Sequence, residues 1–316
     1  MSSANPKATT TIIDDKTAHC LPFILDRLAA HQERHRSNPN AAPPFFLGLN
    51  GVQGIGKTTL VTTLHQTLTT PPHSLPTTVL SIDDLYLPHA AQKSLARSHP
   101  TNSLIQHRGE PGTHDLPLAQ TLFHQLSRRE RTKIPRYDKS AFNGEGDRAD
   151  ESTWEEVNGP GQPQIEVVIF EGWCVGFRAL SPDVLRAKWE EAVREEKQGE
   201  GGPGMLGKLK FQDVEFVNEA LRGYDPLTDS LDALIHLDAE DTHFVYQWRL
   251  EQEAALRATK GSGMNDEQVV EFVNGYYPAY ELFTDTLRAG ISPGDKGRQL
   301  RIVAGRDRKV QHVIFL

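Results

Sequence analysis

The chain has 316 residues, 37% of them hydrophobic and 24% charged, and a formal net charge of −8 at pH 7. This is the composition of an ordinary folded protein, and it contains no apolar run long enough to cross a bilayer. An acidic chain is a poor partner for nucleic acid, so an anionic ligand would need a local cluster of cations. The two cysteines lie far apart and indicate reduced thiols, not a metal site. We therefore expect neither a nucleic-acid nor a membrane partner.

The first 40 residues form an extension ahead of the main domain. Residues 1–15 have no apolar segment typical of a secretory signal and no arginines typical of a transit peptide, so we expect them to be disordered in a cytoplasmic protein. Apolar side chains then recur at helical spacing within residues 19–36, which predicts one amphipathic helix packed on the body. They are Leu21, Ile24, Leu25 and Leu28. Residues 37–44 are a linker, and residues 41–316 are expected to form a single domain.

Four short apolar segments predict buried parallel strands, at residues 45–50, 77–84, 165–173 and 231–238. Segments of helical periodicity separate them, so the predicted fold is α/β, with a mostly parallel sheet and helices on both faces. In such sheets ligands collect at the carboxyl ends of the strands. The glycine-rich residues 50–58, Asp83, Asp84 and Glu171 all fall at such ends.

Other segments complete the expected outline. Residues 138–163 and residues 190–208 are rich in glycine and charge, and we expect loops or surface insertions there. A charged helix over residues 241–259 ends at a KGSG stretch, and a further helix includes residues 266–290. Residues 298–315 predict a hairpin of two strands.

The sequence GVQGIGKT, from Gly51 to Thr58, has the spacing G-x-x-x-x-G-K-[ST] between a strand and a helix. Backbone N–H groups at a helix N-terminus bind phosphate, Lys57 reaches the β and γ oxygens of a nucleotide, and Thr58 offers a hydroxyl to Mg²⁺. The spacing is not that of a dinucleotide-binding loop. The expected nucleotide contacts are Gly51, Gln53, Gly54, Ile55, Gly56, Lys57, Thr58 and Thr59.

The acidic strand ends suggest what is done with the nucleotide. Kinases need a carboxylate that orients an acceptor hydroxyl, and Asp83 stands where such a group would lie. The alternative for Asp83 and Asp84 is helix capping. Glu171 follows a buried strand and could hold Mg²⁺, with a surface turn as the alternative. The predicted metal ligands are Thr58, Asp83 and Glu171.

Several stretches resemble known kinases. GVQGIGKTT, SIDDLYLP, VVIFEGW and an arginine-bearing helix after the fourth strand resemble the phosphoribulokinase, uridine kinase and pantothenate kinase superfamily of P-loop kinases. HRGEPGTHDLPL, IPRYDKSAFNGEGDR, FEGWCVGFR, PLTDSLDALIHL and VYQWRLEQEAALR are similar to the D-glycerate 3-kinases of plants and their fungal relatives. The similarity runs from about Pro44 to Arg308.

This resemblance implies roles for individual residues. Asp83 matches the superfamily's catalytic base, which also assists Mg²⁺, and Glu171 matches its metal-binding carboxylate. Arg249 and Arg257 fall in the family's lid, here about residues 240–263, which brings arginines onto the transferring phosphate. The alternative for the two arginines is ion pairing at the surface, for example between Glu253 and Arg257.

The acceptor implied by the family, D-glycerate, is a small anion with almost no apolar surface, so charge-assisted hydrogen bonds must bind it. Two polar loops, residues 106–115 and 135–148, supply candidate side chains. Arg108, Tyr137 and Arg148 are the leading ones. The full candidate set is Asp84, Tyr86, Arg108, His114, Asp115, Arg136, Tyr137, Lys139 and Arg148. Trp248, Tyr276 and Tyr277 are expected to pack in the core instead of stacking on adenine.

The predicted function is an ATP- and Mg²⁺-dependent kinase that converts D-glycerate to 3-phosphoglycerate by in-line transfer. One alternative is a kinase of a nucleoside or of pantothenate, which would need an apolar slot that these loops do not offer. A second alternative is a switch that binds ATP without transferring its phosphate. We expect a monomer or a small homo-oligomer.

Overall fold

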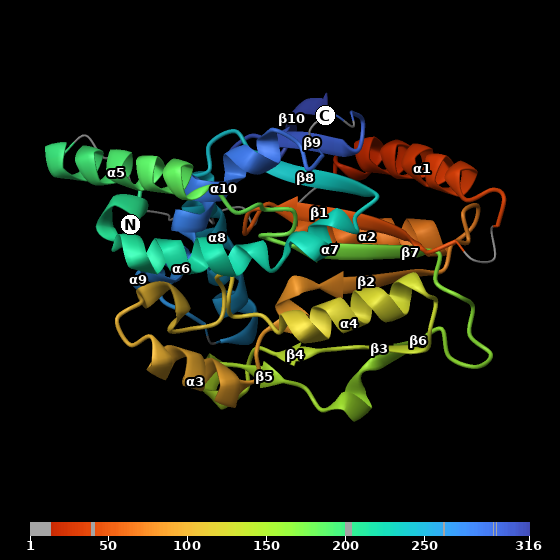
Figure 1. Ribbon diagram of the computed structural model, residues 1–316, viewed down its shortest axis with the longest axis horizontal. Helices are drawn as coiled ribbons and strands as arrows, with labels where there is room; N and C mark the ends of the chain where they lie inside the picture. The colour runs from red at the N-terminus through yellow and green to blue at the C-terminus, as the bar shows by residue number, and fades with distance from the viewer. Residues whose placement is uncertain (1–13, 39–41, 200–203, 262, 293, 295) are drawn as a thin grey trace, which may run out of the picture.

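The computed structural model describes residues 14–38, 42–199, 204–261, 263–292, 294 and 296–316. Residues 1–13, where we expected disorder, lie outside this part. The main sheet has six strands in the order β10–β9–β8–β1–β7–β2, stacked from top to bottom in Figure 1. The strands are β1 (Phe45–Gly51), β2 (Thr77–Ser81), β7 (Val167–Gly172), β8 (Ala233–Ala239), β9 (Gln299–Ala304) and β10 (Val310–Phe315). All neighbours pair in parallel except β9 and β10, so the predicted mostly parallel sheet and C-terminal hairpin are confirmed.

The four strands expected from apolar runs are β1, β2, β7 and β8. β1 and β8 are buried over their whole length, as strands covered on both faces must be. The prediction of a strand over residues 77–84 was too long. β2 ends at Ser81, and Ile82–Leu85 form a 3-10 helix, η2, that carries both aspartates.

Helices cover both faces of the sheet, as predicted. Adjacent side chains of β1 show this, because Phe45 packs edge-on against His31 while Phe46 stacks on Phe123. The helices are α1 (Thr17–Arg34), α2 (Lys57–Thr69), α3 (His89–Ser98), α4 (Leu116–Ser127), α5 (Pro182–Gln198), α6 (Phe211–Arg222), α7 (Asp225–Asp229), α8 (Phe244–Lys260), α9 (Asp266–Asn274) and α10 (Tyr277–Arg288). Among the helices of the described residues, none is long and apolar enough to cross a membrane.

Two predicted segments need correction. Residues 190–198 are not a loop but the second half of α5, which is mostly exposed and rich in the helix formers Glu, Ala, Arg and Lys. The helix expected over 266–290 is two helices, since α9 ends at Asn274 and Pro278 occupies the first turn of α10. Residues 200–203 of the expected insertion lie outside the described residues.

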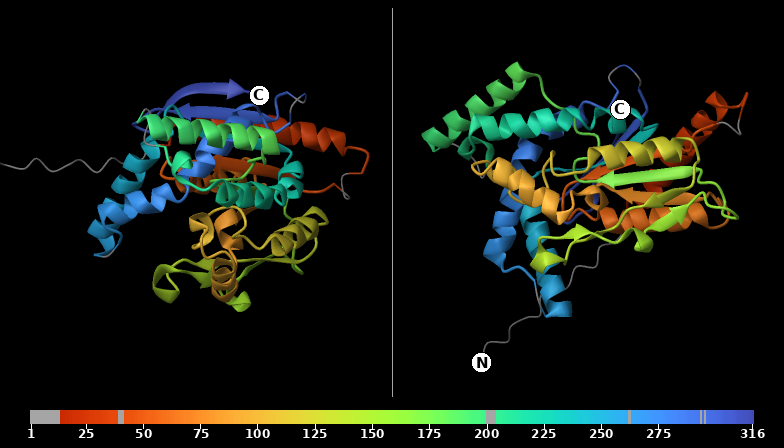
Figure 2. Two further views of the ribbon diagram at one scale, coloured as in Figure 1. Left: turned by 60° about the vertical axis from the view of Figure 1, so that its left-hand side comes forward. Right: turned by 60° about the horizontal axis from the view of Figure 1, so that its bottom comes forward.

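The region expected to be loops also contains short strands. β3 (Thr132–Ile134) pairs with β6 (Glu155–Val157), and β4 (Tyr137–Asp138) pairs with β5 (Asp147–Arg148). Figures 1 and 2 show this region with α3 beyond the β2 edge of the main sheet. The strands are too short for their alternation to be seen in sequence, but they fix the position of candidate acceptor residues.

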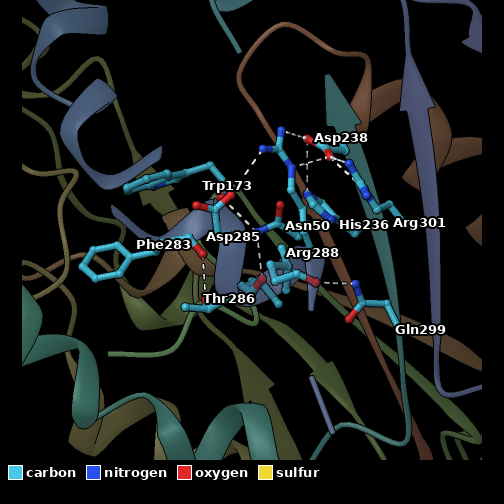
Figure 3. A network of polar contacts seen from close by, with 12 residues as sticks. Asn50, Trp173, His236, Asp238, Phe283, Asp285, Thr286, Arg288, Gln299 and Arg301 are labelled. Carbon is cyan, nitrogen blue, oxygen red and sulfur yellow. Dashed lines mark hydrogen bonds and ion pairs between the residues drawn. The ribbon is translucent and has the colours of Figure 1, made fainter. Parts of the chain in front are cut away.

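Polar contacts hold the carboxyl end of the sheet together (Figure 3). Asp238, at the end of β8, is fully buried and accepts hydrogen bonds from Arg288 and Arg301. These contacts keep the pKa of Asp238 below its ordinary value, although burial acts in the opposite direction. Nearby, the amide of Asn50 donates to the carbonyls of Trp173 and Val175, at 3.0 and 2.8 Å. These contacts within the protein fix the ends of β1, β7 and β8.

The packing of α1 generates a stability prediction. Ile24 is fully buried, whereas Asp26 on the same helix is exposed. Ile24→Ala should lower the free energy of unfolding by about 2–5 kcal/mol, measured by urea denaturation. The matched control Asp26→Ala should change it by less than about 0.5 kcal/mol. Equal, small effects of both substitutions would show that α1 adds nothing to the stability of the core.

Candidate active site

The glycine loop joins β1 to α2, and its backbone needs glycine at particular positions. Gly54 and Gly56 have φ angles of +82° and +105°, which side chains rarely adopt. A Cβ atom at Gly54 would also lie 2.6 Å from the Cβ of Trp248 on α8. Lys57 begins α2, and Thr58 and Thr59 in its first turn are exposed. The loop therefore presents backbone and hydroxyl groups at a helix N-terminus, as the phosphate-binding prediction requires.

Lys57 lies among acidic groups. Its ammonium donates to the carbonyls of Gly51 and Val52, at 2.6 and 3.3 Å. Burial lowers the pKa of Lys57, while the nearby carboxylates of Glu171 and Asp83 act to raise it. The structure therefore brings together the lysine and both carboxylates on which the sequence prediction depended.

Glu171 and Asp83 are brought together by strand pairing. Glu171 on β7 is aligned with Ser81 on β2, whose hydroxyl donates to it at 2.5 Å. Asp83 follows two residues later and accepts from Lys139 at 2.6 Å and from the Tyr86 hydroxyl at 3.1 Å. Burial raises the pKa of Glu171, against the opposing charge of Lys57. Burial acts likewise on Asp83, but Lys139 outweighs it and holds the pKa of Asp83 below its ordinary value.

The donor set suits a magnesium ion that binds together with a nucleotide. Among the described residues, no group of three or more His, Cys, Asp or Glu side chains could hold a metal alone. Mg²⁺ is usually held by one or two carboxylates, water and substrate phosphates, not by an all-protein cage. Thr58, Asp83 and Glu171 supply oxygen atoms of the kind that such a site needs.

The two adjacent aspartates have different partners. Asp84 accepts from the backbone N–H of Tyr137 at 2.9 Å and from the guanidinium of Arg136 at 3.2 Å. It therefore anchors β4 beside η2. Arg136 is further engaged by Glu155 at 2.9 Å. Both Asp84 and Arg136 were predicted as acceptor ligands, and in this structure their partners are protein groups.

Other acceptor candidates do gather near Asp83. Arg148 donates to Asp115 at 2.9 Å and to the carbonyl of Tyr86 at 3.0 Å. Arg108 donates to the carbonyls of Gly144 and Glu145 and lies over the ring of Tyr137, 5.6 Å from its centroid. The two predicted polar loops thus pack against each other.

His114 is held in the same cluster. Its ring stacks on Tyr86 with 4.5 Å between centroids, and its Nδ1 lies 2.6 Å from the hydroxyl of Tyr224. Burial lowers the pKa of His114 to about 4, although the charge of Asp83 opposes this, so the ring is neutral near pH 7. A neutral, stacked ring positions Tyr86 and does not supply positive charge.

The two lid arginines differ in their surroundings. Arg249 is largely buried, lies 5.1 Å from the ring centroid of Phe272, and its positive charge contributes to lowering the pKa of Lys57. Arg257 instead pairs with Asp266 at 2.7 Å and with the carbonyl of Met264. The structure therefore brings Arg249, but not Arg257, to the nucleotide loop. Glu253, which we expected to pair with Arg257, instead forms an ion pair with Arg249 at 3.5 Å.

Buried polar atoms that lack a hydrogen-bond partner among the described residues concentrate around this cluster. They include atoms of Gln53, Glu110, His114, Tyr137, Arg148, Trp173 and Arg249. Such atoms are rare in folded proteins and call for an explanation, of which a binding site is one. Glu110 and Trp173 were missed in the sequence because no motif assigns them a role. The aromatic residues Trp248, Tyr276 and Tyr277 are buried, as expected.

Comparison with known proteins shows the family to which the chain belongs. No protein-family model matches the chain. The chain is 38% identical over 273 residues to an uncharacterized kinase of Schizosaccharomyces pombe, a match that covers 84% of this chain and 90% of that kinase. It is 36% identical over 289 residues to a chloroplastic D-glycerate 3-kinase of Arabidopsis thaliana, covering 90% of this chain and 57% of the plant enzyme. The solved structure of a D-glycerate 3-kinase from Cryptococcus neoformans has a TM-score of 0.84 at 35% identity, covering 96% of this chain and 100% of that one.

The phosphate-binding loop, the parallel sheet and these relatives together define an ATP-dependent phosphotransferase of the P-loop kinase class. More narrowly, the chain belongs to the family that contains the D-glycerate 3-kinases and these fungal kinases. The resemblance drawn from the sequence motifs is thereby confirmed.

The shape of the loop generates a second prediction. Gly54→Ala would place a side chain at a positive φ, which strains the backbone, and its Cβ would clash with Trp248. The substitution should therefore weaken ATP binding at least tenfold, as measured by isothermal titration calorimetry. Gly144→Ala is the matched control, because Gly144 has φ +94° but nothing within 4 Å of an added Cβ. Unchanged ATP affinity in Gly54→Ala would show that the loop does not bind the nucleotide in this conformation.

Proposed function

We propose that this kinase transfers the γ-phosphoryl group of ATP to the 3-hydroxyl of D-glycerate, with Mg²⁺ as the metal. The observation that carries the proposal is the meeting of Lys57, Asp83 and Glu171 beside the glycine loop, with a cluster of arginines nearby. Relatives that carry the name D-glycerate 3-kinase support this choice of acceptor.

Asp83 is proposed to orient the acceptor hydroxyl and to take its proton. Each of its oxygens has one partner, Tyr86 or Lys139, and a carboxylate accepts about four hydrogen bonds in all. A hydroxyl can therefore approach while Lys139 stays close. The lowered pKa of Asp83 keeps it ionised, which suits a loose transition state in which orientation matters more than early deprotonation.

Positive charge is proposed to stabilise the migrating phosphoryl group as the new oxygen–phosphorus bond forms and the bond to ADP breaks. Lys57 and Arg249 are proposed to act on the nucleotide phosphates, and Lys139, which donates to Asp83, on the acceptor side. Mg²⁺ would be held by Thr58 and Glu171, with help from Asp83, and would supply further charge on the phosphates. Arg257 could join them only if it left Asp266.

Recognition of the acceptor is proposed to rest on Arg108, Arg148 and their neighbours. A guanidinium grips a carboxylate through two parallel hydrogen bonds, which compensates for the lack of apolar surface on glycerate. Buried Tyr137, whose hydroxyl has no partner among the described residues, lies beside Arg108. The remaining candidates, Asp84, Arg136, Asp115 and His114, would act by positioning these groups.

The proposal predicts glycerate-dependent turnover. ADP release in a coupled assay should rise at least tenfold above background on addition of D-glycerate, and ³¹P NMR should show 3-phosphoglycerate as the product. Nucleosides and pantothenate are the controls. Stimulation by those compounds alone would favour a kinase of a larger acceptor, and silence with all three would favour an ATP-binding switch.

Removal of the proposed base gives a separate prediction. Asp83→Asn should lower kcat about 10²- to 10⁴-fold, because the amide cannot take the proton, while ATP affinity changes little. Asp138→Asn is the matched control, since Asp138 is exposed and its carboxylate accepts hydrogen bonds from Ser140 in the same turn. Parallel losses of turnover and ATP binding in Asp83→Asn would make Asp83 a structural residue.

A further inference from the structure

Arg308 is a buried arginine in the turn between β9 and β10. It is only 9% exposed, whereas its neighbours Asp307 and Lys309 are exposed, as residues of a hairpin turn usually are. An arginine is rarely buried unless it is paired, because a buried cation needs opposite charge and hydrogen bonds to compensate for the water that it loses. The partners of Arg308 therefore indicate what this position does.

The guanidinium of Arg308 joins two elements that are far apart in the sequence. Its Nε donates to the carbonyl of Gly54 in the glycine loop at 2.8 Å. Its Nη1 donates to the carboxylate of Glu251 on α8 at 2.7 Å, and its Nη2 donates to the carbonyl of Trp248 on the same helix at 3.4 Å. All three nitrogens of one planar group are used, and a planar group holds its partners in fixed relative positions.

The turn that carries Arg308 is itself held in place. The ammonium of Lys16, which is also buried, donates to the carbonyl of Arg308 at 2.6 Å. On the other side, the indole N–H of Trp248 donates to the carbonyl of Arg306 at 2.8 Å. Contacts from the start of α1 and from α8 thus fix the backbone from which Arg308 reaches Gly54.

The bond to Gly54 sets the direction of one predicted phosphate donor. Because a peptide unit is planar and trans, the carbonyl of Gly54 and the N–H of Ile55 point in opposite directions. Ile55 is one of the expected nucleotide contacts, and its N–H makes a long bond, of 3.4 Å, with the carbonyl of Val52. A carbonyl held outward by Arg308 therefore keeps this N–H turned the other way.

The bonds to α8 act on the second group expected to meet the phosphates. Arg249 directly follows Trp248, whose carbonyl Arg308 binds. The loop and this turn of α8 are in close contact, since a Cβ atom at Gly54 would lie 2.6 Å from the Cβ of Trp248. Whatever holds the backbone of Trp248 against the loop thus also places Arg249 beside it.

We propose that Arg308 is a positioning residue that holds the glycine loop against α8, so that the N–H of Ile55 and the side chain of Arg249 meet the same phosphates. The proposal rests on the proposed function of the loop and of Arg249 in phosphoryl transfer, and it does not depend on which alcohol accepts the phosphate. Arg308 acts through these two residues, because the acceptors that it binds are groups of the protein.

The test uses two substitutions at Arg308 and a control in the same turn. Arg308→Met keeps a long apolar stem and removes every donor. The φ of +64° at this position strains both residues alike, since both have a Cβ atom. Arg308→Lys keeps the charge but not the planar fork. Lys309→Met is the matched control, because it removes an exposed cation whose ammonium lies 3.7 Å from Asp307.

Arg308→Met should raise the Kd for ATP about 5- to 30-fold, measured by isothermal titration calorimetry, and should lower kcat at saturating ATP about tenfold. KM for D-glycerate should change less than twofold, because the acceptor loops are not among the partners of Arg308. Arg308→Lys should show smaller changes of the same kind, and Lys309→Met should match the wild type.

A double-mutant cycle tests whether Arg308 acts through Arg249. In the Arg249→Met background, Arg308→Met should lower kcat by less than a further twofold, because the side chain that it positions is already absent. The Kd for ATP should still rise in that background, since the bond to Gly54 is lost in either case. A residue that only stabilised the fold would lower kcat by the same factor in both backgrounds.

Three results would overturn the proposal. They are an unchanged Kd for ATP in Arg308→Met, losses of kcat that multiply with those of Arg249→Met, or a large fall in melting temperature with equal losses for both substrates. A wild type that binds no ATP would instead refute the proposed function. A wild type that binds ATP but does not phosphorylate D-glycerate would refute the proposed acceptor alone, and the Kd for ATP of Arg308→Met would still decide the role of Arg308.

Discussion

The site depends on the parallel pairing of β7 between β1 and β2. This pairing places Glu171 opposite Leu49 on one side and Ser81 on the other. The residues that follow Leu49 form the glycine loop, and those that follow Ser81 carry Asp83. A shift of one residue in either register would turn Glu171 to the other face of the sheet and separate it from Lys57. Strand pairing therefore brings together the residues that we propose to bind the phosphates and the metal ion.

Charge compensation is the second constraint. Lys57, Asp83 and Glu171 are crowded at one end of the sheet, where burial disfavours each ionised group, and exposed Lys139 pairs with Asp83. Each of them is stabilised mainly by the others, so a single neutral substitution unbalances the set. Glu110 and His114 differ from this set, because burial raises the pKa of Glu110 and lowers the pKa of His114.

The features that could be predicted from sequence are those encoded over a few adjacent residues. The glycine loop and the four apolar strands belong to this class, and so do the acids at their ends. The features that could not be predicted from the sequence depend on contacts between distant segments. Asp83 and Asp84 look equivalent in sequence, but of the two only Asp84 accepts hydrogen bonds from Tyr137 and Arg136. Glu110 stands in a loop that looks solvated, but it is buried, and its neighbours Gly109 and Gly112 lie against Tyr276 and Phe216 far along the chain.

The central claim is that nucleotide, metal and acceptor meet where β1, β2 and β7 end. The most direct measurement is a crystal structure with Mg²⁺, a non-hydrolysable ATP analogue and D-glycerate. The account predicts Mg²⁺ about 2.1 Å from the hydroxyl oxygen of Thr58, and the 3-hydroxyl of glycerate about 3 Å from the carboxylate of Asp83. An acceptor bound beyond hydrogen-bond reach of Asp83, or phosphates bound away from Lys57, would contradict it.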